Sequence, residues 1–504
     1  SGTSLINTSR VSIGAKSPLT GGIKESNVGG TISAALARTG VHAIVVAGKA
    51  PEGKSYCIRV TRDGKVELID AEKYRGMGTY EAVEKIFENY GNKNCILCVG
   101  PAGEYGMASA SIQSTDVDGR PCRAAGRGGM GAVMGSKNLK AVKAIGKVFK
   151  TEPVNKSEFS GVKKQAVKYI KNNHFIGHLY REFGTAANVN ISNVGGILPV
   201  NNFQDGSHPQ AIDVSGELLK DKYKTKASSC KACTVLCGHK GGYPDGKTHQ
   251  IPEYETIGLL GTNLGIFDPE KITEWNDLCG KLGMDTISIG GTIAWAMEAG
   301  QKGLFETDLR FGSAEGVSQT ISDIAHRRGP GNELADGTRR LSEKYGGTSF
   351  AIHVKGMELS AYDPRGSWGQ GLSYAVANRG ACHLSAATMA LEVFMGFLNP
   401  FSAKNKAHYV KFFENLFAAT ASFHICLFAA FAYVLEPPIV KYTPKPMLQL
   451  TMRLMPRIAT LLILVPTLVK LYRSITGIRL SQGDIMRAGE RIHLLERYMN
   501  TREG

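Results

Sequence analysis

The sequence predicts an α+β protein, with a β-rich N-terminal domain followed by two mainly α-helical domains. Three observations indicate this fold class. The chain has 504 residues, which exceeds one ordinary hydrophobic core and favours about two or three domains. Strand-like apolar segments lie in the first part, and from about residue 155 onward the apolar periodicity is mostly helical. We place the domains at residues 1–150, 151–345 and 346–504.

The first predicted domain mixes strands and helices. Residues 42–50 (HAIVVAGKA) and 56–70 (YCIRVTRDGKVELID) are strand-like, with a turn at Asp63-Gly64 in the second. Residues 79–91 (TYEAVEKIFENYG) predict a helix with Thr79 as N-cap and Gly91 as C-cap. The later helices are predicted at residues 161–173, 255–265, 272–283, 292–303 and 411–434.

Three cysteines form a C-x2-C-x3-C array within residues 228–240 (SSCKACTVLCGHK): Cys230, Cys233 and Cys237. A single zinc ion is usually bound by two ligand pairs, and no second C-x2-C or H-x3-5-H follows. Three clustered cysteines and one remote cysteine are instead typical of a cubane iron–sulfur cluster. The remaining cysteines are Cys57, Cys95, Cys98, Cys122, Cys279, Cys382 and Cys426.

Cys95 and Cys98 lie in an apolar run that predicts a buried strand, so we interpret them as core residues rather than ligands. The residues alone leave the fourth ligand open. Ten cysteines in 504 residues are too few for a disulfide scaffold, and their clustering favours metal binding in a reducing compartment.

Charge and glycine content indicate what kinds of ligand the chain binds. The net charge is +16, but the sequence shows no nucleic-acid recognition module, so we predict an acidic protein partner and no nucleic acid. Two glycine-rich stretches, residues 9–40 and 119–142, combine bare backbone, basic side chains and a following helix. This combination suits phosphate groups, although a packed glycine-rich helix entry explains it equally well.

Nine motifs in one order, spread over nearly the whole chain, resemble the tungsten-dependent aldehyde ferredoxin oxidoreductase family. The family's opening segment and short C-terminal tail are expected to lie outside this sequence. Besides the cysteine array, the motifs are residues 10–21 (RVSIGAKSPLTG), 25–30 (ESNVGG), 99–104 (VGPAGE), 123–141 (RAAGRGGMGAVMGSKNLKA), 252–266 (PEYETIGLLGTNLGI), 282–288 (LGMDTIS), 361–384 (AYDPRGSWGQGLSYAVANRGACHL) and 489–504 (GERIHLLERYMNTREG).

The resemblance implies tungsten, or molybdenum in its place, bound by the dithiolenes of two pterin cofactors whose phosphates are joined by Mg²⁺. Arg10 and Asn27 match family residues at one pterin, and Arg123 and Ala124 match those at the other. Asn27 and Ala124 would bind the magnesium through their backbone carbonyls. Asp285 matches an aspartate that contacts a pterin.

The resemblance also selects the remaining site residues. It implies a [4Fe–4S] cluster on the cysteine array with Cys426 as fourth ligand, ahead of Cys382. It gives Glu255 and His383 catalytic roles, with Glu255 taking a proton and His383 binding the substrate oxygen. Pro252 favours a helix start that would keep Glu255 ionised. Taken alone, Glu255 is more typical of a solvated helix residue and His383 of a core histidine.

The sequence departs from the family pattern at two kinds of site. Gly280 and Ala421 stand where each of two pterin motifs has a leading aspartate, which puts polar contacts to the pterin rings in doubt. Some members bind a metal at the dimer interface through E-x-x-H. Here that place holds Glu274 and Asp277, so neither that metal nor the familiar dimer is assumed, and an oligomer or a larger complex is expected only in general terms.

A basic segment, residues 437–483, has seven lysines and arginines and no acidic residue. It contains an uncharged apolar run, residues 458–469, that is shorter than the about 20 residues needed to span a bilayer. A buried helical hairpin explains this segment as well as a functional surface does. Of the functional interpretations, a dock for an acidic ferredoxin or iron–sulfur subunit is favoured over a peripheral membrane contact.

The resemblance therefore implies an oxidoreductase of anaerobic, cytoplasmic metabolism. It would interconvert aldehydes and carboxylic acids and pass electrons to ferredoxin or to an iron–sulfur electron-transfer subunit. One alternative is an aromatic acyl-CoA-reducing subunit of the same family. Another is a catalytically silent electron-transfer subunit of a larger complex.

Overall fold

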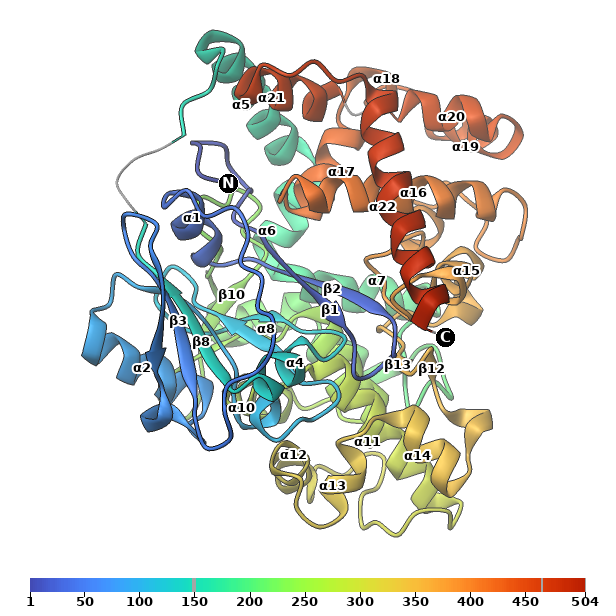
Figure 1. The fold of residues 1–504 in the computed structure, drawn as a ribbon. Helices are drawn as coiled ribbons and strands as arrows, with labels where there is room; N and C mark the ends of the chain where they lie inside the picture. Colours follow the sequence, from blue (N-terminus) through green and yellow to red (C-terminus); the bar gives the residue numbers. More distant parts are fainter. Residues whose placement is uncertain (147–150, 464–465, 504) are drawn as a thin grey trace.

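The computed structural model describes residues 1–146, 151–463 and 466–503, and it confirms the α+β fold class. A six-stranded sheet forms one side of the molecule, and the rest is mostly helical, with three smaller sheets (Figure 1). The strand order is β4-β3-β8-β5-β6-β7, in which only β3 and β8 run parallel. The strands are β3 (Tyr56–Val60), β4 (Val66–Asp70), β5 (Cys95–Cys98), β6 (Ile112–Ser114), β7 (Arg123–Ala125) and β8 (Leu139–Ala144).

Helices cover both faces of this sheet. Cys57, Ile96 and Cys98 point to one face and pack under α2 (Thr79–Tyr90), whose Ile86 is fully buried. The other face packs against α1 (Ile32–Ala37) and α4 (Met130–Ser136). The N-terminal domain also contains the one-turn helix α3 (Pro101–Glu104).

Two local predictions for this domain need correction. Residues 42–50 form no strand; Val45 is 91% exposed, and strand propensity without a neighbouring strand to pair with is not sufficient. Gly78, not Thr79, is the N-cap of α2, so the helix begins one residue earlier than predicted. The predicted hairpin of residues 56–70 and the C-cap at Gly91 are confirmed.

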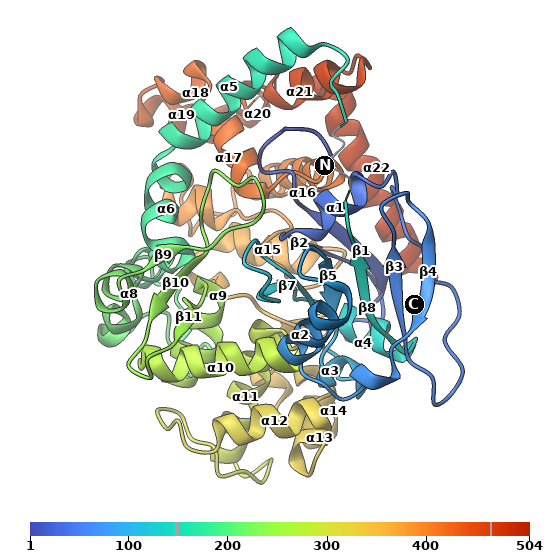
Figure 2. The same cartoon turned by 90° about the vertical axis from the view of Figure 1, so that its left-hand side faces the viewer.

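A separate antiparallel hairpin, β1 (Val11–Lys16) and β2 (Ile23–Val28), joins the N-terminal domain to the end of the chain. Strand β2 contacts β7 on one side and the last helix, α22 (Gln482–Glu503), on the other. Asn500 in α22 accepts a hydrogen bond from the Ile23 backbone N–H at 2.6 Å. The hairpin therefore lies between the sheet and the helical part of the molecule (Figures 1 and 2).

The helical part is built largely as predicted, with two differences. Residues 255–265 form a short helix, α9 (Tyr254–Thr256), followed by π-helical and 3₁₀ turns rather than one α-helix. The predicted helix at 411–434 is two helices, α16 (Lys406–Ser422) and α17 (Leu427–Leu435). The break occurs at His424, whose φ of 57° is left-handed and ends a right-handed helix.

The buried apolar side chains on both sides of residue 345 form one continuous core, so the domain boundary there stays a prediction. Trp275 and Trp295 lie at its centre, fully buried. The remaining helices are α5 (Lys156–Asn172), α6 (Tyr180–Phe183), α7 (Asn188–Val194), α8 (Gly216–Tyr223), α10 (Pro269–Leu282), α11 (Thr286–Gln301), α12 (Val317–His326), α13 (Pro330–Leu334), α14 (Thr338–Tyr345), α15 (Trp368–Val376), α18 (Pro438–Lys441), α19 (Lys445–Leu454), α20 (Pro456–Leu462) and α21 (Pro466–Thr476). The remaining strands are β9 (Lys226–Ala227), β10 (His239–Gly242), β11 (Thr248–Gln250), β12 (His353–Val354) and β13 (Met357–Glu358).

Candidate functional site

The cysteine array lies in the loop between β9 and β10, and the structure brings Cys426 to it. Asn7 joins the two parts: its backbone N–H donates to the Ala232 carbonyl at 3.0 Å, and its own carbonyl accepts from the Cys426 N–H at 2.9 Å. The Asn7 side-chain amide also donates to Cys233 Sγ at 3.5 Å. Cys426 is the N-cap of α17, so the break between α16 and α17 is what presents this thiol to the loop.

The loop is bent tightly around its thiols. Ala232 and Leu236 have left-handed φ values of 54° and 60°, which are uncommon for residues other than glycine. The Leu236 N–H donates to Cys233 Sγ at 3.4 Å. A Cβ atom on Gly29 would lie 2.4 Å from Cys230 Sγ, so the ESNVGG motif needs glycine there to approach the array.

Two guanidinium groups face the thiols. Arg10 Nη2 donates to Cys426 Sγ at 3.5 Å. Burial lowers the pKa of Arg10, but the charges of Cys426, Cys230 and Cys237 outweigh it and raise the pKa above its ordinary value. The pKa of Arg123 is raised in the same way, against burial, with Cys230 as the first contributor. These cations compensate part of a thiolate cluster's negative charge.

Burial raises the pKa of Cys233 to about 11 and that of Cys237 well above its ordinary value. Buried thiolates therefore need a bound cation, and a metal supplies one. In the parts of the chain that the structure describes, no group of three or more His, Cys, Asp and Glu side chains closes on a single metal ion. Four thiols at the corners of a polynuclear cluster lie farther apart than the ligands of one ion, so this finding is compatible with the cluster interpretation.

Cys95, Cys98 and Cys382 lie elsewhere. Cys95 and Cys98 are on β5, which confirms the strand predicted there, and Cys98 is fully buried. Cys382 is buried in a small apolar cluster with Leu19 and Met357.

A second group of side chains surrounds Glu255 and His383. Glu255, in α9, and His383, in the loop after α15, lie with Oε1 and Nδ1 3.2 Å apart, and each side chain is 15% exposed. Glu255 Oε2 accepts from the Ala361 N–H at 2.9 Å, whereas Oε1 makes no well-aligned hydrogen bond. Burial raises the pKa of Glu255 to about 7, so burial outweighs the helix-start effect that the sequence suggested.

Ser360 sets the orientation of the His383 ring. Its hydroxyl oxygen accepts from Arg127 Nη1 at 2.9 Å and from the His383 backbone N–H at 3.3 Å. The hydroxyl proton is therefore free to donate to His383 Nδ1, 2.8 Å away. With Nδ1 as acceptor, Nε2 carries the proton of the neutral ring. Burial, with the Arg127 charge, lowers the pKa of His383 to about 3, which keeps the ring neutral.

Arg127 connects this group to the second glycine-rich stretch. Besides Ser360, it donates to the carbonyls of Ala381 at 2.6 Å and of Glu358. Its Nε lies 3.7 Å from Asp285 Oδ2, and Asp285 is the N-cap of α11. Sequence reasoning missed Arg127 and Ser360. Arg127 was within a quoted motif, but an arginine in a glycine-rich loop is not specific, and a lone serine carries no signal.

Comparison with known proteins decides which family this geometry belongs to. Residues 1–146 match the N-terminal domain of aldehyde ferredoxin oxidoreductase, and residues 161–504 match its domains 2 and 3. The chain belongs to the aldehyde ferredoxin oxidoreductase family. It is thus a member of a family of oxidoreductase enzymes.

Two relatives show how close the similarity is. The chain is 40% identical to the tungsten-containing aldehyde ferredoxin oxidoreductase of Pyrococcus furiosus over 443 residues, which cover 85% of this chain and 71% of that one. It is 38% identical, with the same coverage, to that of Thermococcus kodakarensis.

A similar solved structure is the active-site complex of benzoyl coenzyme A reductase with 1,5-dienoyl-CoA. One of its chains has a TM-score of 0.78 and 20% identity, and the match covers 100% of this chain and 80% of that one. At this identity, the similarity describes the fold alone.

The residues that the family resemblance assigns to the pterins and magnesium come from neighbouring elements. Asn27 is on β2 and Ala124 on β7, and these strands contact one another. Four buried polar atoms in this region have no hydrogen-bond partner: Asn27 Nδ2, Arg123 Nε, Arg127 Nε and Glu255 Oε1. Buried polar groups are normally satisfied, so unpaired atoms on these residues fit contacts with a polar cofactor. The residues present therefore fit the family's cofactor.

The departures from the family pattern have definite surroundings. Gly280 lies on α10, where a Cβ would meet the Tyr80 ring at 3.8 Å, and its carbonyl accepts from the Thr79 hydroxyl at 2.8 Å. Ala421 is in the last turn of α16. Asp277 is paired within the chain, with its Oδ2 2.5 Å from His249 Nδ1, and Glu274 pairs with Lys271 at 3.0 Å.

Proposed function

We propose that this enzyme interconverts aldehydes and carboxylic acids at a tungsten or molybdenum centre held by two pterins. Electrons would pass through a [4Fe–4S] cluster to ferredoxin or an iron–sulfur partner subunit. The observation that carries the proposal is the Glu255–His383 pair. A carboxyl group with a pKa of about 7 and a neutral imidazole with a fixed tautomer lie 3.2 Å apart in a family of aldehyde oxidoreductases.

The chain's own residues have separable roles in this proposal. Arg10, Asn27, Arg123 and Ala124 would hold the pterin phosphates and Mg²⁺, and Asp285 would contact a pterin. Cys230, Cys233, Cys237 and Cys426 would bind the cluster. The loaded metal centre supplies the two-electron acceptor that the oxidation of an aldehyde with water requires.

His383 and Glu255 would act on the substrate. The Nε2–H of His383 donates a hydrogen bond to the aldehyde oxygen and orients the carbonyl carbon. Glu255, as the carboxylate, accepts one of the two protons that are released when aldehyde and water become a carboxylic acid. A pKa of about 7 allows Glu255 both to take this proton and to return it at neutral pH.

A second candidate is the reduction of an aromatic acyl-CoA thioester. It is supported by the similarity in fold to benzoyl coenzyme A reductase, over the full length of this chain. The third possibility, a silent electron-transfer subunit, does not account for Glu255 and His383, because such a subunit needs neither.

Partner and location follow the same proposal. Electrons leave singly, so ferredoxin or an iron–sulfur subunit of a larger complex is the expected partner, and the oxygen-sensitive cluster favours the anaerobic cytoplasm. Pro456–Thr476, a stretch that includes residues 464 and 465 outside the described part, is long and apolar enough for a membrane span, but 40% of its 18-residue apolar window is buried in the protein. A buried core helix meets the same criteria, so this stretch is weak evidence for a membrane span.

Anaerobic assays of the purified protein distinguish the two activities. We expect reduction of benzyl viologen that depends on an added aldehyde. Glu255→Gln should lower this activity by about 10²- to 10⁴-fold, while Glu343→Gln, a change on the exposed side of α14, should leave it unchanged. Viologen-dependent turnover of benzoyl-CoA with no aldehyde activity would replace the first proposal by the second. No activity with either substrate, in protein that contains its metals, would favour the silent subunit.

A further inference from the structure

The structure divides the basic segment, residues 437–483, into two surfaces at different ends of α17. Helix α21 packs on α5, and its Tyr472 ring lies 5.4 Å from that of Phe423, three residues before Cys426. Helices α19 and α20 instead pack over Phe431, Val434 and Leu435, in the C-terminal half of α17. Because α17 has nine residues, its two ends are about 13 Å apart.

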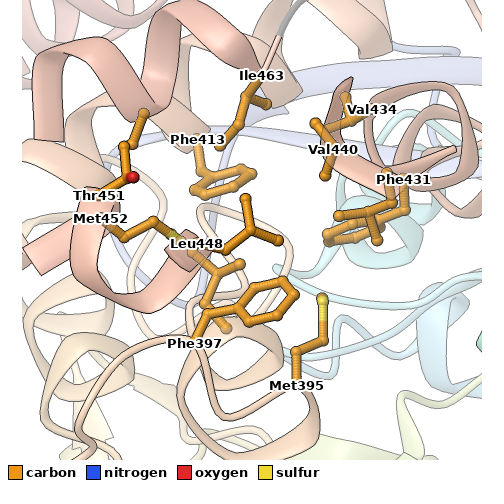
Figure 3. A pocket seen from close by; sticks show the side chains of 13 residues that line it. Met395, Phe397, Phe413, Phe431, Val434, Val440, Leu448, Thr451, Met452 and Ile463 are labelled. Carbon is orange, nitrogen blue, oxygen red and sulfur yellow. The ribbon is translucent and has the colours of Figure 1, made fainter. Parts of the chain in front are cut away.

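The inner faces of α19 and α20 are fixed to the body of the protein. They line an apolar cavity of about 30 Å³ with α16 and α17, into which Leu448 and Met452 point (Figure 3). The Tyr409 hydroxyl donates to the Met452 carbonyl at 2.7 Å, and Gln449 donates to the Gly396 carbonyl at 2.7 Å. These contacts determine which side of each helix faces outward.

The outward side of α19 and α20 is apolar. We call it the amphipathic face: Met447, Leu450, Leu454, Ile458 and Leu461, together with the cations beside them. The five apolar side chains are 60%, 56%, 57%, 48% and 67% exposed, in that order. Their spacing of three and four residues places those within each helix on one side. Single exposed apolar side chains are ordinary on a protein surface, but five on two adjoining helices form a patch.

The cations of this face have no acidic partners. Arg453 and Arg457 are exposed and make no ion pair with any described residue, and no acidic residue occurs between 437 and 483. Glu436, just outside the segment, pairs with Lys441 at 2.6 Å. The face is therefore apolar, positively charged and uncompensated.

The apolar and positively charged character of this face limits what can bind to it. A second copy of the chain, related by a two-fold axis, would bring two surfaces of the same positive charge together. An electron acceptor has reason to bind at the Cys426 end of α17, where α21 lies, rather than at the far end. Exposed apolar side chains beside arginines match a membrane surface, which has an apolar interior and anionic headgroups.

We propose that the amphipathic face of α19 and α20 binds the surface of an anionic lipid bilayer. The helices would lie in the plane of the interface, with the five apolar side chains among the acyl chains and Arg453 and Arg457 at the headgroups. Helix α21 would not enter the bilayer in this arrangement, because its buried Thr467, Leu468, Leu471 and Ser474 hold it in the body of the protein. The cluster loop stays free for an electron partner. The proposal does not depend on the catalytic activity.

Cosedimentation of the full-length chain with vesicles tests this. We expect binding to phosphatidylcholine vesicles that contain phosphatidylglycerol, with a partition coefficient that falls as salt is added, and much weaker binding to phosphatidylcholine alone. R453Q/R457Q should lower the partition coefficient roughly 25-fold, about fivefold for each cation. L454E/L461E should abolish binding at any salt concentration. The matched control V45E/L68E, at exposed apolar positions in the N-terminal domain and with the same charge change, should bind like the natural chain.

Three results would overturn the proposal. One is the absence of binding to anionic vesicles, in protein whose circular dichroism and thermal unfolding are unchanged. Another is binding that the control variant loses as fully as the two test variants. The third is loss of binding to an acidic ferredoxin, but not to vesicles, in R453Q/R457Q, which would assign the face to a protein partner.

Discussion

At the residue scale, Glu255 shows how burial can set the pKa of a reactive group. Its carboxyl lies in surroundings that raise its pKa to about 7, while the Arg127 charge and the Ala361 N–H limit the rise. His383, 3.2 Å away, is held neutral by burial and by the same arginine. The Arg127 charge therefore acts on both groups. It limits the rise in the pKa of Glu255, and it helps to keep the His383 ring neutral.

The pH dependence of aldehyde oxidation should report Glu255. The carboxylate is the active form, so kcat/KM should rise with pH up to about 7 and level off above it. Glu255→Gln should lower the rate by about 10²- to 10⁴-fold. Because a raised carboxyl pKa stabilises the fold only while the group is protonated, the same variant should unfold at a higher temperature than the natural chain above pH 7 and not below pH 4.5. A flat pH–rate profile would contradict this role.

Ser360 should act through His383 rather than on the substrate. Ser360→Ala removes the donor to Nδ1 and the acceptor for Arg127, so the ring can take the wrong tautomer. We expect kcat to fall roughly 10- to 100-fold, with KM less affected. Ser360→Thr keeps the hydroxyl and should restore most of the loss. The ¹⁵N shifts of His383 should change in Ser360→Ala, and an unchanged tautomer with reduced activity would rule out the positioning role.

At the element scale, breaks and caps place the site more than regular structure does. Cys426 reaches the cysteine loop because α16 ends at Ser422 and the chain turns at His424 before α17. Asp285 faces Arg127 because it caps α11. The sequence patterns indicated the helices but not these turns, since a left-handed histidine has no signature in periodicity.

The hairpin of β10 and β11 carries a histidine between two carboxylates. His249 Nδ1 lies 2.5 Å from Asp277 and Nε2 lies 2.9 Å from Asp245. Partial burial lowers its pKa, but the hydrogen bonds to both aspartates outweigh it and raise the pKa above 6.5. The stability from this charged pairing is fully present below pH 6.5 and is lost as the pH rises through the raised value.

His249→Gln should therefore lower the free energy of unfolding more at pH 6 than at high pH. The difference should be on the order of 1 kcal/mol, since these groups are partly exposed and screened. Urea unfolding at several pH values and constant ionic strength measures it. His42→Gln, which changes a histidine for which the structure shows no carboxylate partner, is the matched control. An effect of His249→Gln that does not depend on pH would mean that His249 contributes packing and not charge.

At the scale of the whole molecule, the sequence predicted the fold class, the family and most of the helical segments. The strand predicted at residues 42–50 was wrong, because an apolar pattern does not reveal whether a neighbouring strand exists to pair with it. Arg127 and Ser360 could not be identified, because their importance comes from meeting across 233 positions of the chain. The basic segment was treated as one unit, and only the structure separates α21, near Cys426, from the outward face of α19 and α20.

The cofactor content is the central claim, since every proposed catalytic and electron-transfer role depends on it. Elemental analysis of protein purified without oxygen, for tungsten, molybdenum, iron, zinc and acid-labile sulfide, tests it most directly. We predict about one tungsten or molybdenum atom and about four iron and four sulfide per chain, with Cys426→Ala lowering the iron and sulfide. Zinc bound in place of iron, or iron without tungsten or molybdenum in cells supplied with both, would contradict the account.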